Sequence, residues 1–489
     1  MLRIDLLRQL DLGKSVAEFD TSLAKYFVET QTFHDLVNNK GDIIAGDKGT
    51  GKTALFQILT TRYRQIPELA RVEVLPAFNP SGSPVFQRLA EKDVLTEGQY
   101  VTIWKAYILS LVGNWLLEIY EDKLSEDMKR LDELLKKLDM RSPDATANTI
   151  FSKVINWLKR LIPKSISTEI TFNAEGIPVI TPKVELDGKA DAIPQKEETI
   201  THEYAMGLLN RILETENFSI WLILDRLDEA FQGFPNTEIP ALRALLRTYL
   251  DMMAFGKIRL KLFVRKDLFR RVIAGGFVNL THINARKIDI IWEDSDLNNL
   301  LFRRINENRL FLQNAGLGDA SWVDIFSVLF PPQVDVGERK TTTWNWMLSR
   351  VRDGNGVKSP RNLLDLVAKA QDAQLRKEAR GSLEHTKQES LISSESIKKG
   401  LSALSDERVN DTLLAEAANH ADIILKFQDG KAEHNQKTIS QLLNIEDEGR
   451  IKDQIKSLME IGFLEQIGES YKIPSLYRDG LRITQGKAF

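Results

Sequence analysis

The chain contains no cysteine, and this absence removes several kinds of chemistry at once. Disulfides, cysteine nucleophiles, and zinc or iron–sulfur sites built from thiolates all need that side chain. The six histidines are scattered along the sequence, without the close helical pairing that is typical of a metal site. Any catalysis by this chain must therefore depend on other groups.

Long hydrophobic runs and a strong net charge are also missing. No apolar run approaches the roughly 18 residues expected of a membrane span, and residues 1–8 lack the central apolar block of a secretory signal. We therefore expect a cytoplasmic protein without a membrane span. The formal net charge is only −3 at pH 7, which disfavours a chain that coats nucleic acid by charge alone but leaves room for a local basic groove.

The length of 489 residues is enough for about three domains. A hydrophobic fraction of 43% and a charged fraction of 28% are ordinary for globular proteins. Composition thus sets the scale of the molecule but does not choose its function.

One stretch matches the nucleotide-binding pattern G-x-x-x-x-G-K-[ST] at every specified position. It follows an apolar run at 42–45 and precedes a helical pattern at 54–59, as the motif requires. We call it the phosphate loop, and its residues are Gly46, Asp47, Lys48, Gly49, Thr50, Gly51, Lys52 and Thr53. The alternative is a glycine-rich turn before an ordinary helix, which the agreement of the motif with both flanks disfavours.

The chemistry of this loop predicts ATP and Mg²⁺ as cofactors. Its glycines allow backbone N–H groups to surround phosphate oxygens, and the following helix adds a positive end. Lys52 is expected to reach the β- and γ-phosphates, and the hydroxyl of Thr53 to bind Mg²⁺. We expect no metal beyond this ion.

A second nucleotide motif is predicted at residues 219–229. The apolar strand 219–224 ends in Asp225, a carboxylate that can hold Mg²⁺ through water. Asp228 and Glu229 follow, and either can orient and deprotonate the attacking water.

At these motifs the chain resembles the STAND and KAP branches of P-loop ATPases, which are relatives of AAA+ proteins. In the standard AAA+ pattern a glutamate follows the Mg²⁺ aspartate, whereas Arg226 stands there in this chain. We therefore prefer Asp228 as the catalytic acid, with Glu229 second. The resemblance implies ATP hydrolysis and an α/β fold with a parallel sheet and an extra strand between the two nucleotide motifs.

The same resemblance implies two arginines that sense the γ-phosphate. Arg265 ends the predicted strand 258–264, where the wider superfamily places such a sensor. Arg361 lies at the start of a predicted helix that has proline near its first turn, and it resembles the second sensor of AAA+ lids. The alternative for Arg361 is a charge on the surface of a helix.

We predict four parts along the chain: a helical leader at 1–40, a P-loop ATPase core at 41–290, a helical lid and connector at 291–410, and a winged-helix domain at 411–489. The leader is expected to pack on the ATPase core, either beside the nucleotide or as a cover of the sheet. An insertion at about 140–197 interrupts the core and includes a predicted hairpin around residues 173–176. The winged helix is predicted from helices at 438–443 and 449–461, followed by a hairpin around 468–469.

Two functions follow from this organisation. The first is a STAND-like ATPase switch that controls oligomeric assembly or a separate protein effector, with antiviral defence as an implication of the resemblance. The alternative is a DNA-binding ATPase of origin-recognition-like plan that loads or remodels a nucleoprotein complex. Residues 438–489 carry eight acids and seven bases, a net charge of −1, which favours a winged helix that contacts protein over one that contacts DNA. An inactive nucleotide-binding scaffold is a third hypothesis.

Overall fold

The computed structural model describes residues 1–78, 95–142, 202–227, 235–382, 384–386, 389–415 and 420–489, with short pieces at 146–147, 149–150, 153–154, 170–172 and 178–180. These residues form two compact units. The sheet unit comprises Gln31–Gly46 and Leu55–Asp289, and the helical unit comprises Met1–Thr30, Asp47–Ala54 and Ile290–Phe489.

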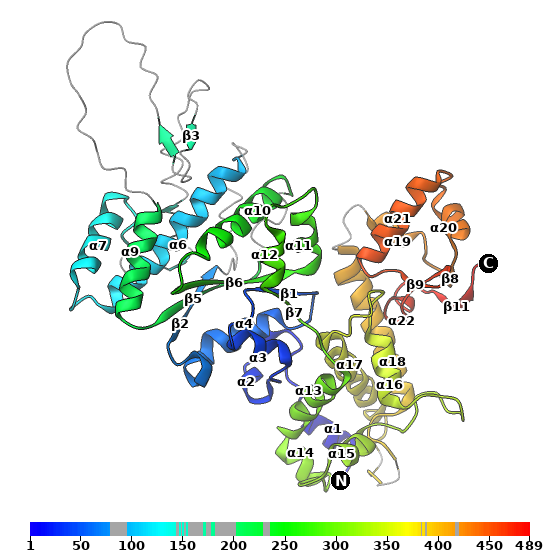
Figure 1. Cartoon of the computed structure of the whole chain (residues 1–489). Helices are drawn as coiled ribbons and strands as arrows, with labels where there is room; N and C mark the ends of the chain where they lie inside the picture. Colours follow the sequence, from blue (N-terminus) through cyan, green and yellow to red (C-terminus); the bar gives the residue numbers. More distant parts are fainter. Residues whose placement is uncertain are drawn as a thin grey trace, which may run out of the picture. The chain divides into compact units, whose positions relative to one another are not determined.

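Five parallel strands form the centre of the sheet unit, in the order β2–β5–β6–β1–β7 (Figure 1). Their bounds are β1 Ile43–Gly46, β2 Val72–Phe78, β5 Ser219–Leu224, β6 Ile258–Arg265 and β7 Lys287–Asp289. The apolar runs of β1 and β5 are almost wholly buried, as is typical of central strands in a parallel sheet. The α/β fold with a parallel sheet is therefore confirmed.

One strand lies between the two nucleotide motifs along the chain, and a different strand lies between them in the sheet. In sequence β2 comes between β1 and β5, but in the sheet β2 lies at the edge. In space β6 lies between β1 and β5 and pairs with both of them. The strands that carry the two nucleotide motifs are thus not neighbours.

Helices cover both faces of this sheet, with α6, α10, α11 and α12 on one face and α3 and α4 on the other (Figure 1). The helices of the unit are α3 Gln31–Val37, α4 Lys52–Arg62, η2 Tyr63–Gln65, η3 Pro67–Leu69, α6 Glu97–Ile119, α7 Glu126–Lys137, α9 His202–Thr215, α10 Pro235–Met252, α11 Lys266–Ile273 and α12 Leu280–Ala285. The first three residues of α4 belong to the helical unit. A hairpin is also present, because β3 Ile170–Phe172 pairs antiparallel with β4 Pro178–Ile180. Most of the predicted insertion at 140–197 lies outside the described residues.

The aromatic side chains of α6 belong to the core of the sheet unit. Tyr100, Trp104 and Tyr107 are at most 2% exposed. The indole N–H of Trp104 donates to the Ala241 carbonyl oxygen at 2.9 Å, which joins α6 to α10. The helix begins with a capping box in which Thr96 and Gln99 satisfy each other's backbone N–H groups.

The helical unit has a hydrophobic core of its own. Its helices are α1 Arg3–Gln9, η1 Ala17–Phe19, α2 Leu23–Tyr26, α13 Asp294–Asn306, α14 Arg309–Asn314, α15 Trp322–Leu329, α16 Thr343–Val351, α17 Pro360–Glu378, α18 Ser394–Glu407, the π-helical turn η5 Arg408–Leu414, α19 Ala421–Leu425, α20 Gln436–Leu443, α21 Glu448–Glu460 and α22 Ser475–Arg478. No helix in the described part of the chain is both long enough and apolar enough to cross a bilayer.

The first helix of the amino-terminal leader packs within the helical unit. Leu6, Leu7 and Leu10 of α1 belong to the core of the helical unit, and the Gln371 amide of α17 donates to the Leu7 carbonyl oxygen at 2.8 Å. Only α3, at the end of the leader, belongs to the sheet unit. The leucines of α1 thus share a core with α17, and the packing of the leader on the ATPase core stays a prediction.

The two helices and the hairpin predicted near the carboxyl terminus are present as α20, α21 and the pair β9 Glu465–Ile467 and β10 Ser470–Lys472. With β8 Lys431–His434 and β11 Thr484–Lys487 they complete a four-stranded sheet of order β11–β8–β10–β9. We refer to residues 420–489 as the C-terminal part.

A buried ion pair fixes the start of β1. Lys261, in the middle of β6, is fully buried, and its amine contacts an Asp42 carboxylate oxygen at 2.8 Å. Burial lowers the pKa of Lys261 to about 8, against the attraction of Asp42. Burial would raise the pKa of Asp42, but Arg286 and Lys261 outweigh it and the pKa is lowered. Both groups therefore remain charged at neutral pH.

We expect Asp42→Asn to lower the free energy of unfolding by about 3 kcal/mol, because it leaves the Lys261 charge buried without its carboxylate. Urea unfolding followed by circular dichroism measures this. The control is Asp35→Asn, which removes an exposed partner of Lys40 and should cost about 0.5 kcal/mol or less. Adding Lys261→Met to Asp42→Asn should recover stability, and equal losses for the two aspartates would contradict the account.

Candidate nucleotide site

The phosphate loop joins β1 to α4 with the geometry that its motif requires. Gly46 is the last residue of β1, and α4 begins at Lys52. Gly49 and Gly51 have φ angles of 77° and 96°, in the left-handed region that favours glycine. The Thr50 hydroxyl and the Lys52 amine both donate to the Asp47 carbonyl oxygen, at 2.8 and 2.9 Å. The loop is thus a tight turn that opens a helix, which is the arrangement of an anion cradle.

The predicted Mg²⁺ ligands lie at the ends of elements. Thr53 is the second residue of α4. Asp225 directly follows β5 and is only 2% exposed, and Arg226 after it takes a left-handed φ of 56°. Because β1 and β5 run parallel in one sheet, their carboxyl ends lie at the same edge. Asp228 and Glu229 lie outside the described residues, and their catalytic roles remain predictions.

Arg265 lies beside the beginning of the phosphate loop. In the pairing of β6 with β1, Arg265 is the register partner of Gly46. Its guanidinium donates to both carboxylate oxygens of Asp267, at 3.0 and 2.9 Å. Burial would raise the pKa of Asp267, but the charge of Arg265 outweighs this effect and the pKa is lowered. The backbone position fits the predicted sensor, and the side chain is held by Asp267.

Three residues of the helical unit contact the phosphate loop. The Ser359 hydroxyl donates to the Gly49 carbonyl oxygen at 2.9 Å, and the Trp292 indole N–H donates to the Thr50 carbonyl oxygen at 2.8 Å. A Cβ atom added at Gly49 would lie 2.6 Å from the Ser359 hydroxyl oxygen and 3.1 Å from the Arg361 Cβ. Arg361 is therefore placed against the loop that it was predicted to sense.

Sequence reasoning missed the parts played by Ser359 and Trp292. Ser359 precedes Pro360 at the start of α17 and had been considered only as part of that helix start. Trp292 lies between β7, which ends at Asp289, and α13, which begins at Asp294. A serine before proline does signal a helix start, yet no local pattern indicates that its hydroxyl contacts a distant glycine.

The loop that joins α16 to α17, residues 352–359, also contacts the C-terminal part. The Gly354 N–H donates to the Gly462 carbonyl oxygen at 2.7 Å. The Asp353 carboxylate accepts from the N–H groups of Asn355 and Val357 at 2.9 and 3.0 Å, which shapes the loop. Burial raises the pKa of Asp353 to about 6, and the nearby charge of Asp47 adds to this effect. One short loop therefore meets both the phosphate loop and the turn after α21.

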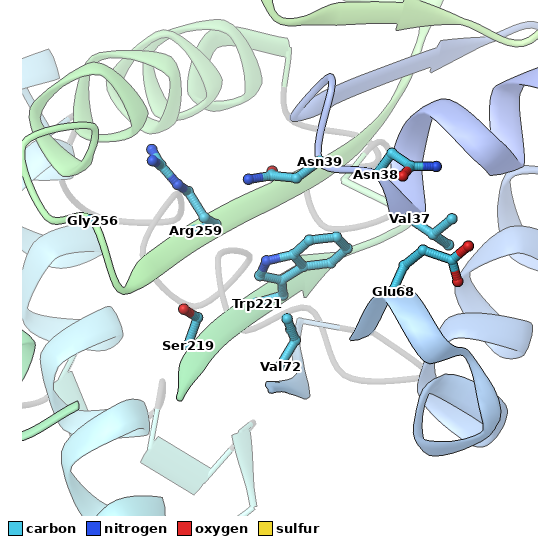
Figure 2. Close-up of a pocket in the computed structure, with 9 residues that line it drawn as sticks. All are labelled: Val37, Asn38, Asn39, Glu68, Val72, Ser219, Trp221, Gly256 and Arg259. Carbon is cyan, nitrogen blue, oxygen red and sulfur yellow. The ribbon is translucent and has the colours of Figure 1, made fainter. Parts of the chain in front are cut away.

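A cavity of about 360 Å³ in the sheet unit lies away from this site. It is lined at the beginnings of β2, β5 and β6, at the edge opposite the phosphate loop. Figure 2 shows the Trp221 ring between Arg259 and Glu68, with Asn39 close by. The Lys261 amine lies over the Trp221 ring, 4.0 Å from its centroid, and donates to the Asn39 amide oxygen at 2.7 Å. Two residues that line the cavity, Trp221 and Asn39, therefore also contact the lysine of the buried ion pair.

Comparisons with known proteins do not establish a family. No family model and no curated protein matches the chain. Among solved structures, the Walker-type ATPase PABY2304 of Pyrococcus abyssi is 12% identical with a TM-score of 0.41, covering 97% of this chain and 100% of that one. The ORC2 protein of Aeropyrum pernix, in ADPNP–ADP complexes, is 14% identical with a TM-score of 0.36 over 92% and 90%. The ORC1 protein of the same organism, in complex with DNA, is 11% identical with a TM-score of 0.37 over 96% of each chain.

We expect Gly49→Ala to weaken the binding of a non-hydrolysable ATP analogue roughly tenfold. The left-handed φ costs an alanine about 1–2 kcal/mol, and the added methyl group would press on Ser359. Isothermal titration calorimetry measures the affinity. Gly98→Ala is the matched control, because a Cβ there meets nothing within 4 Å. Native affinity in Gly49→Ala would show that the loop is not confined by its neighbours.

Proposed function

We propose that this chain is an ATP-binding and ATP-hydrolysing switch of the AAA+ and STAND-like kind. Its nucleotide state would set the arrangement of the α16–α17 loop and, through it, of the C-terminal part. The observation that carries the proposal is the double contact of that loop, in which Ser359 bonds to Gly49 and Gly354 bonds to Gly462.

The phosphate loop would hold ATP and Mg²⁺. The positive φ angles of Gly49 and Gly51 fit a backbone that approaches phosphate closely. Lys52 would bind the β- and γ-phosphates, and Thr53 and Asp225 would bind the ion. Bound ATP and Mg²⁺ supply the phosphoryl group and neutralise part of its charge. Asp228, with Glu229 as the second candidate, would orient and deprotonate the attacking water.

The two arginines would report whether the γ-phosphate is present. Arg265 would have to leave Asp267, with which it now pairs. Arg361 already lies beside Gly49, so a change in the phosphate loop would displace the start of α17. ATP can drive such a change only if it binds two arrangements of the chain with different affinity.

The output of the switch would be self-association or control of a separate protein effector. We place this output in the helical lid and connector at 291–410 and in a winged-helix domain at 411–489 that contacts protein. The helices α20 and α21 and the hairpin β9–β10 support this plan, because they follow in winged-helix order. Antiviral defence is the biological setting that the resemblance to STAND proteins implies.

We expect Lys52→Ala to abolish ATP binding and Asp228→Asn to keep binding but to lower turnover roughly 10²–10⁴-fold, the usual contribution of a positioned base. Phosphate release and calorimetry measure the two properties. The control is Asp319→Asn, an exposed carboxylate of the helical unit. Turnover unchanged in Asp228→Asn would assign the base to another residue, and binding without turnover in the native chain would favour the inactive scaffold.

We expect Gly354→Ala to uncouple hydrolysis from the output. An added Cβ would lie 2.5 Å from the Leu464 carbonyl oxygen and 2.7 Å from that of Gly462, so the loop must leave the C-terminal part. Turnover should stay within about threefold of native, while the ATP-dependent change in solution mass should be lost. Gly318→Ala is the control, because its Cβ meets nothing within 4 Å. A native change in mass in Gly354→Ala would contradict the proposed route.

A further inference from the structure

A cavity of about 260 Å³ in the helical unit has four cations among its nine lining residues. Its charged residues come from four neighbouring segments: Arg350 from α16, Arg352 from the α16–α17 loop, Glu465 and Lys472 from the hairpin β9–β10, and Arg478 from α22. Four positive charges thus face one negative charge. None of these residues is a predicted nucleotide ligand, although Arg352 belongs to the α16–α17 loop described above.

One of the four cations is neutralised within the cavity. The Arg352 guanidinium contacts the two Glu465 carboxylate oxygens at 3.0 and 3.1 Å. Arg350 lies 3.8 Å from Asp335, but the amine of Lys398 holds the same carboxylate at 2.6 Å. The charge of Arg350 is therefore only partly balanced.

The remaining two cations form no salt bridge in the described part of the chain, although the charges of Asp479 and Glu465 act on Arg478 and partly offset the effect of burial on its pKa. Arg478 donates to the Ile473 carbonyl oxygen at 2.8 Å and to the Gln485 amide oxygen at 2.6 Å, both of which are neutral. The Lys472 amine has no ion pair or hydrogen bond to any described residue. Burial lowers the pKa of Arg350 and of Arg478, and the proximity of Arg478 lowers that of Arg350 further. Like charges are thus held together where water is partly excluded.

Holding like charges together in a partly buried cavity costs free energy unless an anion binds between them. Arginine presents a planar fork that matches phosphate oxygens, and lysine adds a point charge. The volume of 260 Å³ is slightly below the ~300 Å³ at which pockets for drug-sized ligands begin. The cavity therefore fits one or two phosphate groups better than a whole nucleotide.

We propose that this cavity, which we call the basic pocket, binds a small phosphorylated anion such as a diphosphate or a phosphate monoester. Arg350, Lys472 and Arg478 would bind its oxygens, and Glu465 would weaken the affinity by repulsion. Because α16 and the C-terminal part both line the pocket, the bound anion would stabilise their contact. The inference goes beyond the proposed ATP switch and does not depend on hydrolysis.

The experiment titrates inorganic pyrophosphate and inorganic phosphate, in separate runs, into the full-length chain carrying Lys52→Ala, which removes the main phosphate ligand of the nucleotide site. Calorimetry should detect binding of at least one of them. Adding Lys472→Gln should weaken that binding roughly tenfold, the loss expected for a charge-assisted hydrogen bond, whereas Glu465→Gln should strengthen it. Lys456→Gln, which removes an exposed lysine of α21 outside the pocket, should leave it unchanged.

Lys472 is the chosen position because its side chain makes no described contact whose loss would unfold the chain, and thermal melting checks this. Absence of binding in the Lys52→Ala chain, or equal affinity in all variants, would overturn the proposal. The same titration with a 20-base-pair DNA duplex tests whether the pocket binds nucleic acid instead of a small phosphorylated anion. Binding of the duplex that Lys472→Gln weakens, with no binding of phosphate or pyrophosphate, would assign the pocket to nucleic acid and overturn the proposal as well.

Discussion

The hydrogen bond from the Ser359 hydroxyl to the Gly49 carbonyl oxygen holds the α16–α17 loop against the phosphate loop. Because Gly49 has no side chain, the backbone of the loop can approach Ser359 and Arg361 closely. Directly after Ser359, α17 starts at Pro360. At Gly354 the same loop bonds to the turn after α21. A displacement at Gly49 therefore has a short covalent and hydrogen-bonded route to the C-terminal part.

The strand that presents the phosphate loop is fixed from its other end. Asp42, just before β1, is buried with Lys261 and Arg286, and Tyr249 donates to it at 3.0 Å. The buried Asp42 carboxylate is stable only beside its cationic partners, because elsewhere in the interior its charge would be neither paired nor solvated. The start of β1 is thus held by three side chains from other elements. A strand held in this way would be a suitable base for the loop that we propose to bind nucleotide.

The sequence was informative wherever a local pattern has one physical cause. The apolar run of β5 before Asp225, the glycine spacing of the phosphate loop and the proline at the start of α17 each predicted the element found there. The failures concern contacts between distant residues. Nothing local indicates that Trp292 caps the Thr50 carbonyl, that α1 packs on α17, or that Lys261 in an apolar strand pairs with Asp42. The cations of the basic pocket likewise come from two regions far apart in the sequence, Arg350 and Arg352 in one and Lys472 and Arg478 in the other, which meet only in the fold.

In the proposed switch, nucleotide binding at the phosphate loop changes the C-terminal part through the α16–α17 loop. Amide hydrogen exchange with and without a non-hydrolysable ATP analogue tests it most directly, in the native chain and in Lys52→Ala. The account predicts that the analogue changes exchange at 46–53, at 353–358 and at 462–464 in the native chain, and at none of these in the variant. A change confined to 46–53 would contradict it, because the nucleotide would then be bound without moving the loop that joins the two regions.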